Sequence, residues 1–298
     1  MRILVTGGSG FIGTEVVRRL RARGDDVVVI DLNPFADPSV HCVVGDICDP
    51  GALAEAFGEG TEAVVHLAAI TSVLKSVNDP DGVFRTNVIG TQRILERCRE
   101  LGTKRLVFAS SNAVVGDVGA ETISELSPMR PLTPYGSTKA SCEMLLWTYA
   151  GSYGMQTAAL RFTNVYGTGM QAKDSVVARL MKAAMGGPAV PIYGDGEQRR
   201  DYVFVSDAAS AVELGLGVGG AEVMTIGAGR SVSMNELHAL ASEVVGFEIP
   251  VTESPAKPGE MPAVIVDTSH AASLGFHAEY DLRSGLAATW EDFRASAG

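Results

Sequence analysis

Residues 6–13 read TGGSGFIG, and they directly follow the apolar run ILV at residues 3–5. The run predicts a buried strand, and Phe11–Arg23 has the periodicity of an amphipathic helix. Three glycines spaced three residues apart join the two elements: Gly7, Gly10 and Gly13. Glycine permits a tight turn and close packing, so the stretch predicts a helix whose first N–H groups face an anion. By itself it fits a purely structural glycine turn equally well.

The same alternation of short apolar runs and longer amphipathic stretches continues to about residue 163. Further strands are expected at residues 27–30, 41–44, 63–67, 105–108 and 158–162, and further helices at 51–57, 79–101 and 135–153. Strands that alternate with helices predict an α/β fold with a Rossmann-type, doubly wound parallel sheet.

After Tyr166 the sequence has more loops and shorter periodic segments. We expect residues 1–166 to form a nucleotide-binding domain and residues 167–298 a second, smaller α/β lobe for the substrate. The boundary is approximate, and the two parts are allowed to interleave along the chain.

The composition excludes several classes of protein. Of the 298 residues, 24 are basic and 35 acidic, giving a formal net charge of −11, which argues against binding to nucleic acid or to an anionic membrane. We find neither the apolar run of about 20 residues that spans a bilayer nor a signal-peptide pattern, so we expect a cytoplasmic protein. The four cysteines form no C-x-x-C pair, and no metal site is predicted.

Asp31 ends the second predicted strand, 18 residues beyond Gly13. A carboxylate there can accept hydrogen bonds from both hydroxyls of an adenosine ribose, and it repels a 2′-phosphate. The next residues, Leu32, Asn33 and Pro34, offer no cation for that phosphate. The sequence therefore favours NAD over NADP, although Asp31 could instead simply cap a turn.

Residues after the third and fourth strands extend this cofactor site. Asp46 can accept a hydrogen bond from the adenine amino group while Ile47 packs on the adenine ring. The segment Leu67, Ala68 and Ala69 is small enough for the cofactor to pass over it. We expect His66 to be a core residue rather than an acid or a base.

Tyr135 and Lys139 are four residues apart and therefore share one face of a helix. A tyrosine that acts as a base near neutral pH needs a cation beside it, because its ordinary pKa is about 10. Ser111, at the end of the preceding predicted strand, is suited to hydrogen-bond the substrate hydroxyl that Tyr135 deprotonates.

The chain resembles, over nearly its full length, an extended short-chain dehydrogenase/reductase of the NAD-dependent sugar-nucleotide epimerase/dehydratase family, UDP-glucose 4-epimerase-like. The landmarks are TGGSGFIG, Asp31, GDI at Gly45, VHLAA ending at Ala69, SVNDP at Ser76, NVIGT at Asn87, ASSNAVVG at Ala109, PYGSTK at Pro134, RFTNVYG at Arg161 and RRDYVFVSDAA at Arg199.

The resemblance implies roles for individual residues. Tyr135 is the general base, Lys139 lowers its pKa and holds the nicotinamide ribose, and Ser111 orients the reacting hydroxyl. The other implied cofactor contacts include Phe11, Ile12, Asn87 and Thr163.

For the substrate, Asn164 and Arg200 match residues that bind a diphosphate. Lys257 and Glu260, in KPGE, match charged residues of the family's R-P-G-D segment that grip the phosphate and the nucleoside ribose. Both depart from that pattern, and a solvated loop pair is an equal alternative for them.

The residues after Ser111 bear on the reaction. Family members that eliminate water or carbon dioxide carry an acid there, whereas this chain has Asn112 and Ala113, and Val115 replaces the usual tyrosine. We therefore expect a 4-epimerase of a UDP- or dTDP-linked hexose or uronate. The alternatives are a sugar or uronate dehydrogenase, an NDP-sugar ketoreductase, and an inactive NAD-binding protein.

A homodimer is also expected from the resemblance, with Leu145, Leu146 and Trp147 of the Tyr135 helix at its interface. Burial of the same residues against the sheet is the alternative.

Overall fold

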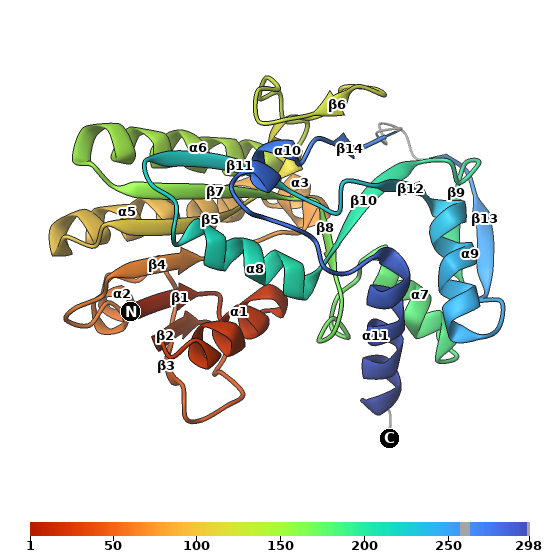
Figure 1. Cartoon of the computed structure of the whole chain (residues 1–298), viewed down its shortest axis with the longest axis horizontal. Coiled ribbons are helices and arrows are strands. Elements are labelled where there is room, and N and C mark those ends of the chain that lie inside the picture. The colour runs from red at the N-terminus through yellow and green to blue at the C-terminus, as the bar shows by residue number, and fades with distance from the viewer. Residues whose placement is uncertain (257–262, 297–298) are drawn as a thin grey trace.

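The structure is a computed structural model that describes residues 1–256 and 263–296 (Figure 1). Its centre is a seven-stranded sheet in the spatial order β11, β7, β5, β4, β1, β2, β3, in which all neighbouring strands are parallel. The strands are β1 (Arg2–Thr6), β2 (Asp26–Asp31), β3 (His41–Val44), β4 (Ala63–His66), β5 (Arg105–Ser111), β7 (Gln156–Phe162) and β11 (Ala221–Ile226). The predicted doubly wound parallel sheet is confirmed.

Alternate side chains of each strand enter two separate hydrophobic cores. Ile3 and Val5 of β1 pack with α1 (Phe11–Ala22) and α8 (Val205–Gly215), which lie side by side in Figure 1. Leu4, between them, faces the opposite core. The helices on that opposite side are α2 (Pro50–Ala56), α5 (Gly90–Leu101) and α6 (Pro134–Tyr153). Burial on both faces explains why the strands are continuous apolar runs.

The segment expected to be one helix from residue 79 to 101 is divided. Pro80–Phe84 is α4, Arg85–Ile89 is a π-helical turn, and α5 begins at Gly90. A π turn rotates the side chains that follow it and is often found at functional sites. A further short helix, α3 (Val73–Asn78), precedes α4.

The second lobe is built on three small sheets and several helices. Its strands are β6 (Thr122–Ile123), β8 (Asn164–Tyr166), β9 (Val190–Tyr193), β10 (Arg199–Phe204), β12 (Ser231–Ser233), β13 (Val251–Ser254) and β14 (Ile265–Val266). Its helices are α7 (Val176–Ala184), α9 (Met234–Val245) and α11 (Leu282–Ala295), whereas α10 (Ser269–Ser273) packs against β11 of the large sheet. Tyr166, Phe204 and Leu286 belong to the core of this lobe.

The two parts interleave along the chain. After β8 has entered the second lobe, α8 returns to cover the large sheet, and β11 pairs with β7 at its edge. A division at residue 166 therefore separates β8 from its partner β10 and leaves β11 apart from its sheet. The proposed domain limits stay a prediction.

The outer face of α6 bears on the expected homodimer. Leu146 is buried in the core, whereas Met144 and Trp147 are 58% and 64% exposed. The homodimer stays a prediction, with Trp147 rather than Leu146 available to a partner. Within the described residues, no helix is long and apolar enough to cross a membrane.

Candidate active site

The glycine turn brings three segments of backbone into close contact. Gly7 has a φ of +72°, and a Cβ there would lie 2.6 Å from the amide nitrogen of Ala68. A Cβ on Gly13 would lie 2.2 Å from the carbonyl oxygen of Gly7. Helix α1 begins after Gly10 with no side-chain cap and no acidic residue in its first turn. Its first N–H groups are thus available to an anion.

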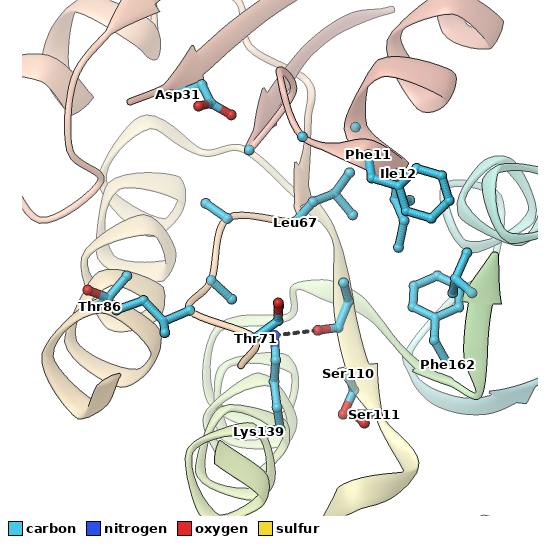
Figure 2. A pocket seen from close by; sticks show the side chains of 18 of the residues that line it. Phe11, Ile12, Asp31, Leu67, Thr71, Thr86, Ser110, Ser111, Lys139 and Phe162 are labelled. Atoms are coloured by element: carbon cyan, nitrogen blue, oxygen red, sulfur yellow. Dashed lines mark hydrogen bonds between the residues drawn. The ribbon is translucent and has the colours of Figure 1, made fainter. Parts of the chain in front are cut away.

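A cavity of about 520 Å³ lies over this turn and runs between the carboxyl ends of the strands. Figure 2 shows Asp31 at one end and Lys139 with Ser111 at the other, with Phe11 and Ile12 at one side. The predicted site residues that line it are Gly7, Gly10, Phe11, Ile12, Gly13, Asp31, Leu32, Asp46, Ile47, Leu67, Ala68, Ala69, Ser111, Tyr135, Lys139, Thr163 and Asn164. The fold therefore gathers most of the predicted cofactor and catalytic residues around one space.

Asp31 is held in position by two backbone amides. Its Oδ2 accepts a hydrogen bond of 3.1 Å from Ser9 N–H, and its Oδ1 accepts one of 3.0 Å from Asn33 N–H. Asn33 does not line the cavity, and its carbonyl accepts a bond from the Ser9 hydroxyl. Among the described lining residues, the basic ones are Lys139 and Lys173, and neither adjoins Asp31 in sequence. The arrangement fits a ribose without a 2′-phosphate.

Ser111, Tyr135 and Lys139 come from β5 and α6. Thr133 caps α6 by accepting a 3.2 Å bond from Gly136 N–H, and Pro134 occupies its first turn. Lys139, one turn after Tyr135, donates from Nζ to the carbonyl oxygen of Ala109 at 2.6 Å (Figure 2). Its Nζ is also 6.0 Å from the centroid of the Tyr135 ring. A cation is therefore fixed beside the phenol.

The surroundings shift the pKa values of this group. Burial raises the pKa of Tyr135 above its usual value, and a hydrogen bond with Ser111 opposes the rise. Burial lowers the pKa of Lys139 to about 8. Because the net shift of Tyr135 is upward, a role as a base would require positive charge near the phenol, and Lys139 is the cation beside it.

His66 lies beneath the site and is fully buried. Its Nδ1 is 2.7 Å from Thr6 Oγ1, and its Nε2 is 2.9 Å from Thr91 Oγ1. Burial, with a smaller contribution from Lys139, lowers its pKa to about 3. The structure thus places His66 in the core, as the sequence predicts.

Asn87 does not line the cavity but supports its wall. Its side chain accepts from Ile70 N–H at 2.8 Å and donates to Ile70 O at 3.1 Å and to Thr138 Oγ1 at 3.0 Å. The π turn that carries Asn87 is therefore joined both to the segment after β4 and to α6. A direct contact with the cofactor stays a prediction.

Thr163 and Asn164 meet the second lobe through the buried Asp201. Thr163 Oγ1 donates to Asp201 Oδ1 at 2.8 Å, and Asn164 Nδ2 donates to the Asp201 carbonyl at 2.9 Å. The same carboxylate accepts from the backbone N–H groups of Ala228 and Arg230, each at 2.9 Å. Asp201 thus links the two lobes at the edge of the cavity.

A second cavity of about 340 Å³ adjoins the first and shares Asn164, Val165 and Ser175 with it. Arg200 lines this second cavity. Asn164 and Arg200, both predicted to bind the substrate diphosphate, therefore face one space. Lys257 and Glu260 lie outside the described residues.

The structure also brings residues to the first cavity that sequence reasoning missed. These are Ile70, Thr71, Thr86, Ser110, Phe162, Lys173 and Ser175, among others. Thr71 follows the predicted AA segment and could have been found from it. Lys173 could not, because it lies in a loop after β8 that carries no motif, and no short-range pattern points it at the cavity.

Comparison with known proteins agrees with this geometry. A family model described as "NAD dependent epimerase/dehydratase family" matches residues 3–227. The chain is 34% identical to a putative UDP-glucose 4-epimerase of Methanocaldococcus jannaschii, with 95% of each protein covered. It is 35% identical to a dTDP-glucose 4,6-dehydratase of Streptomyces niveus, in an alignment that covers 99% of this chain and 93% of the relative. A crystal structure of the Thermus thermophilus UDP-glucose 4-epimerase complexed with NAD superposes with a TM-score of 0.93 at 33% identity, over 99% of this chain and 100% of the other.

Proposed function

The chain belongs to the NAD-dependent epimerase/dehydratase family, and from that premise we propose that it is a 4-epimerase of a nucleotide-diphosphate sugar. The substrate class is a UDP- or dTDP-linked hexose or uronate, and the reaction passes through a transient 4-keto sugar.

Three residues carry the chemistry in this proposal. Tyr135 takes the proton from the 4-hydroxyl, Ser111 orients that hydroxyl, and the ammonium of Lys139 stabilises the phenolate. The bound NAD supplies reversible hydride transfer at C4. The bond from Lys139 to the Ala109 carbonyl supports this assignment, because it holds the ammonium near the ring of Tyr135.

The choice of epimerisation over dehydration rests on one observation: the residues next to Ser111 in the sequence are not acidic. Asn112 and Ala113 follow Ser111, and among the described residues that line the cavity the carboxylates are Asp31, which ends β2, and Asp46, which follows β3. Elimination of water needs an acid and a base at C5 and O6 of the sugar. Because these positions lack them, the site favours epimerisation over dehydration.

Epimerisation also requires the keto sugar to rotate while the diphosphate stays bound. Asn164 and Arg200 line the second cavity, and Asn164 also lines the first, where Tyr135 lies. We infer that they hold the diphosphate and leave the sugar free to turn. Their loss should weaken affinity, whereas loss of Ser111 or Tyr135 should reduce turnover.

A second candidate function is a sugar or uronate dehydrogenase. Asn112 favours it, because its carboxamide is buried beside Ser111, and neither its Oδ1 nor its Nδ2 has a partner among the described residues. Asn112 is not among the residues that line the two cavities, so a carboxylate or hydroxyl of an unusual sugar would satisfy that amide only if the wall beside Ser111 opened. Val115, in place of a tyrosine, is compatible with such a substrate.

One experiment separates the two. The protein is incubated with UDP- and dTDP-linked hexoses and uronates, product configuration is followed by NMR, and NADH is followed by absorbance. The proposal predicts epimers without accumulating NADH, and Tyr135→Phe should abolish their formation while leaving NAD binding nearly intact. Stoichiometric NADH from a sugar acid would instead identify a dehydrogenase.

A further inference from the structure

Lys173 brings a cation from the second lobe to the mouth of the NAD cavity. It lines that cavity together with Phe11 and Ile12 of the first turn of α1. Its Nζ lies 5.7 Å from the centroid of the Phe11 ring. The ammonium therefore lies beside the side chain of the first residue of α1, in the same cavity as the helix N-terminus at which a dinucleotide's diphosphate would bind.

Lys173 forms no ion pair within the described part of the chain. Its ammonium has no carboxylate partner there, and desolvation by neighbouring atoms lowers its pKa. The adjacent Asp174 is already engaged, because both of its oxygens accept bonds of 2.7 Å from Arg179. Lys173 is exposed to solvent, and a cation without a counter-charge that lines the cavity beside the first turn of α1 is suited to bind an anionic ligand.

The loop that presents Lys173 is fixed at several points. Asp292 Oδ2, on α11, accepts from Gly169 N–H at 2.8 Å and from Gln171 Nε2 at 2.6 Å. Lys182 Nζ, on α7, donates to the carbonyl oxygen of Lys173 itself at 2.7 Å. These contacts hold the backbone of residues 169–173 in place, so little ordering remains to be done when Lys173 meets a ligand.

We propose that Lys173 is a clamp that the second lobe places on the diphosphate of bound NAD, so that the cofactor stays with the enzyme. The diphosphate carries two negative charges near the start of α1, where no acidic side chain competes for the cation. The other cation lining the cavity within the described residues, Lys139, lies at its far end and is bonded to the Ala109 carbonyl. The benefit of retention rests on the proposed epimerase reaction, in which the cofactor returns to its starting state; the contact itself rests only on NAD binding.

The test measures cofactor release rather than turnover. Four proteins are loaded with NADH and mixed with excess NAD: wild type, Lys173→Met, Lys173→Arg and the control Lys104→Met. Lys104 is an exposed lysine before β5. Loss of NADH fluorescence gives the dissociation rate. We expect about 10-fold faster release from Lys173→Met, the size of one charge-assisted contact, and near wild-type release from the other two. The difference should shrink at high salt. Equal rates for Lys173→Met and wild type overturn the proposal.

Two further experiments identify the ligand of Lys173 and the role of the loop at residues 169–173. Binding of UDP to the NAD-loaded proteins tests whether Lys173 serves the substrate diphosphate; an effect of Lys173→Met confined to UDP affinity overturns the assignment. Asp292→Ala, which removes the acceptor of both loop bonds, should also speed NADH release, but not when Lys173 is already methionine, because Asp292 acts through the loop. Additive effects in the double variant contradict that positioning role. None of these measurements requires the protein to epimerise a sugar, so failure of the proposed function leaves the test intact.

Discussion

The Nζ of Lys139 donates a hydrogen bond of 2.6 Å to the carbonyl oxygen of Ala109, and it thereby joins α6 to the end of β5. The same ammonium lies 4.5 Å from the centroid of the Phe108 ring. Lys139 is thus held by the central sheet, and its charge has a fixed place next to Tyr135.

Replacing Lys139 by methionine should therefore change the pH dependence of the reaction as well as its rate. Turnover should fall at least ~100-fold, the range of general-base catalysis, and the acid limb of the kcat profile should move to higher pH. The reason is that loss of a nearby cation raises the pKa of a tyrosine that burial already raises. A slower enzyme with an unmoved acid limb would show that Lys139 acts only by position.

Asp31 should determine the choice between cofactors. Asp31→Asn keeps an oxygen for one of the two amides, that of Ser9 or that of Asn33, and removes the charge that repels a 2′-phosphate. Calorimetry should show the preference for NAD over NADP falling about 10-fold, as expected for loss of one charged contact. Asp37→Asn, which removes an exposed carboxylate paired with Arg21, is the matched control and should leave the preference unchanged. An unaltered preference in Asp31→Asn would place the selectivity elsewhere.

Glu143 and Arg161 form an ion pair 2.8 Å apart whose side chains are each 2% exposed. Glu143 also accepts a hydrogen bond from Ser110, so the pair ties α6 to β5 and β7. Glu143→Gln should lower the free energy of unfolding by roughly 3 kcal/mol, because it leaves a buried guanidinium uncompensated. Glu15→Gln, which breaks a pair with the exposed Arg18, should cost less than about 1 kcal/mol. The free energy of unfolding of both variants is measured with urea. Equal decreases in Glu143→Gln and Glu15→Gln would contradict the structural importance of the buried pair.

His66 should make the fold sensitive to acid. Its folded pKa of about 3 lies below the value of about 6.5 in an unfolded chain, so below pH 6.5 the unfolded state binds a proton that the folded state excludes. This histidine alone should reduce the free energy of unfolding by roughly 2 kcal/mol between pH 7 and pH 5. His66→Gln should lose that part of the dependence, whereas His277→Gln, at an exposed site, should keep it. The same acid slope in all three proteins would contradict the burial of a neutral imidazole.

Local patterns were enough to predict the first half of the chain and much of the site. TGGSGFIG, Asp31 and the pair Tyr135 and Lys139 are short-range signals, because each combines a spacing with the end of one strand or the face of one helix. Their convergence then follows from the rule that the carboxyl ends of parallel strands meet at one edge of the sheet.

The features that were missed depend on contacts between distant segments. Strand β11 has an ordinary apolar sequence, AEVMTI, and only its pairing with β7 places it in the large sheet. The π turn around Asn87 carries a side chain whose bonds reach Ile70 and Thr138, which are 17 and 51 residues away. Lys173 is one polar residue in a glycine-containing loop, and only the packing of the two lobes brings it to Phe11.

The most direct test of the central claim follows the hydrogen at C4 of the sugar. A UDP- or dTDP-sugar that the protein converts is prepared with deuterium at C4, and its turnover is monitored by NMR and by absorbance at the NADH band. The account predicts an epimer that retains deuterium at C4, with no accumulation of NADH, because the same hydride leaves and returns within one site. Loss of the deuterium from the sugar together with stoichiometric NADH, or elimination of water from the sugar, would contradict it.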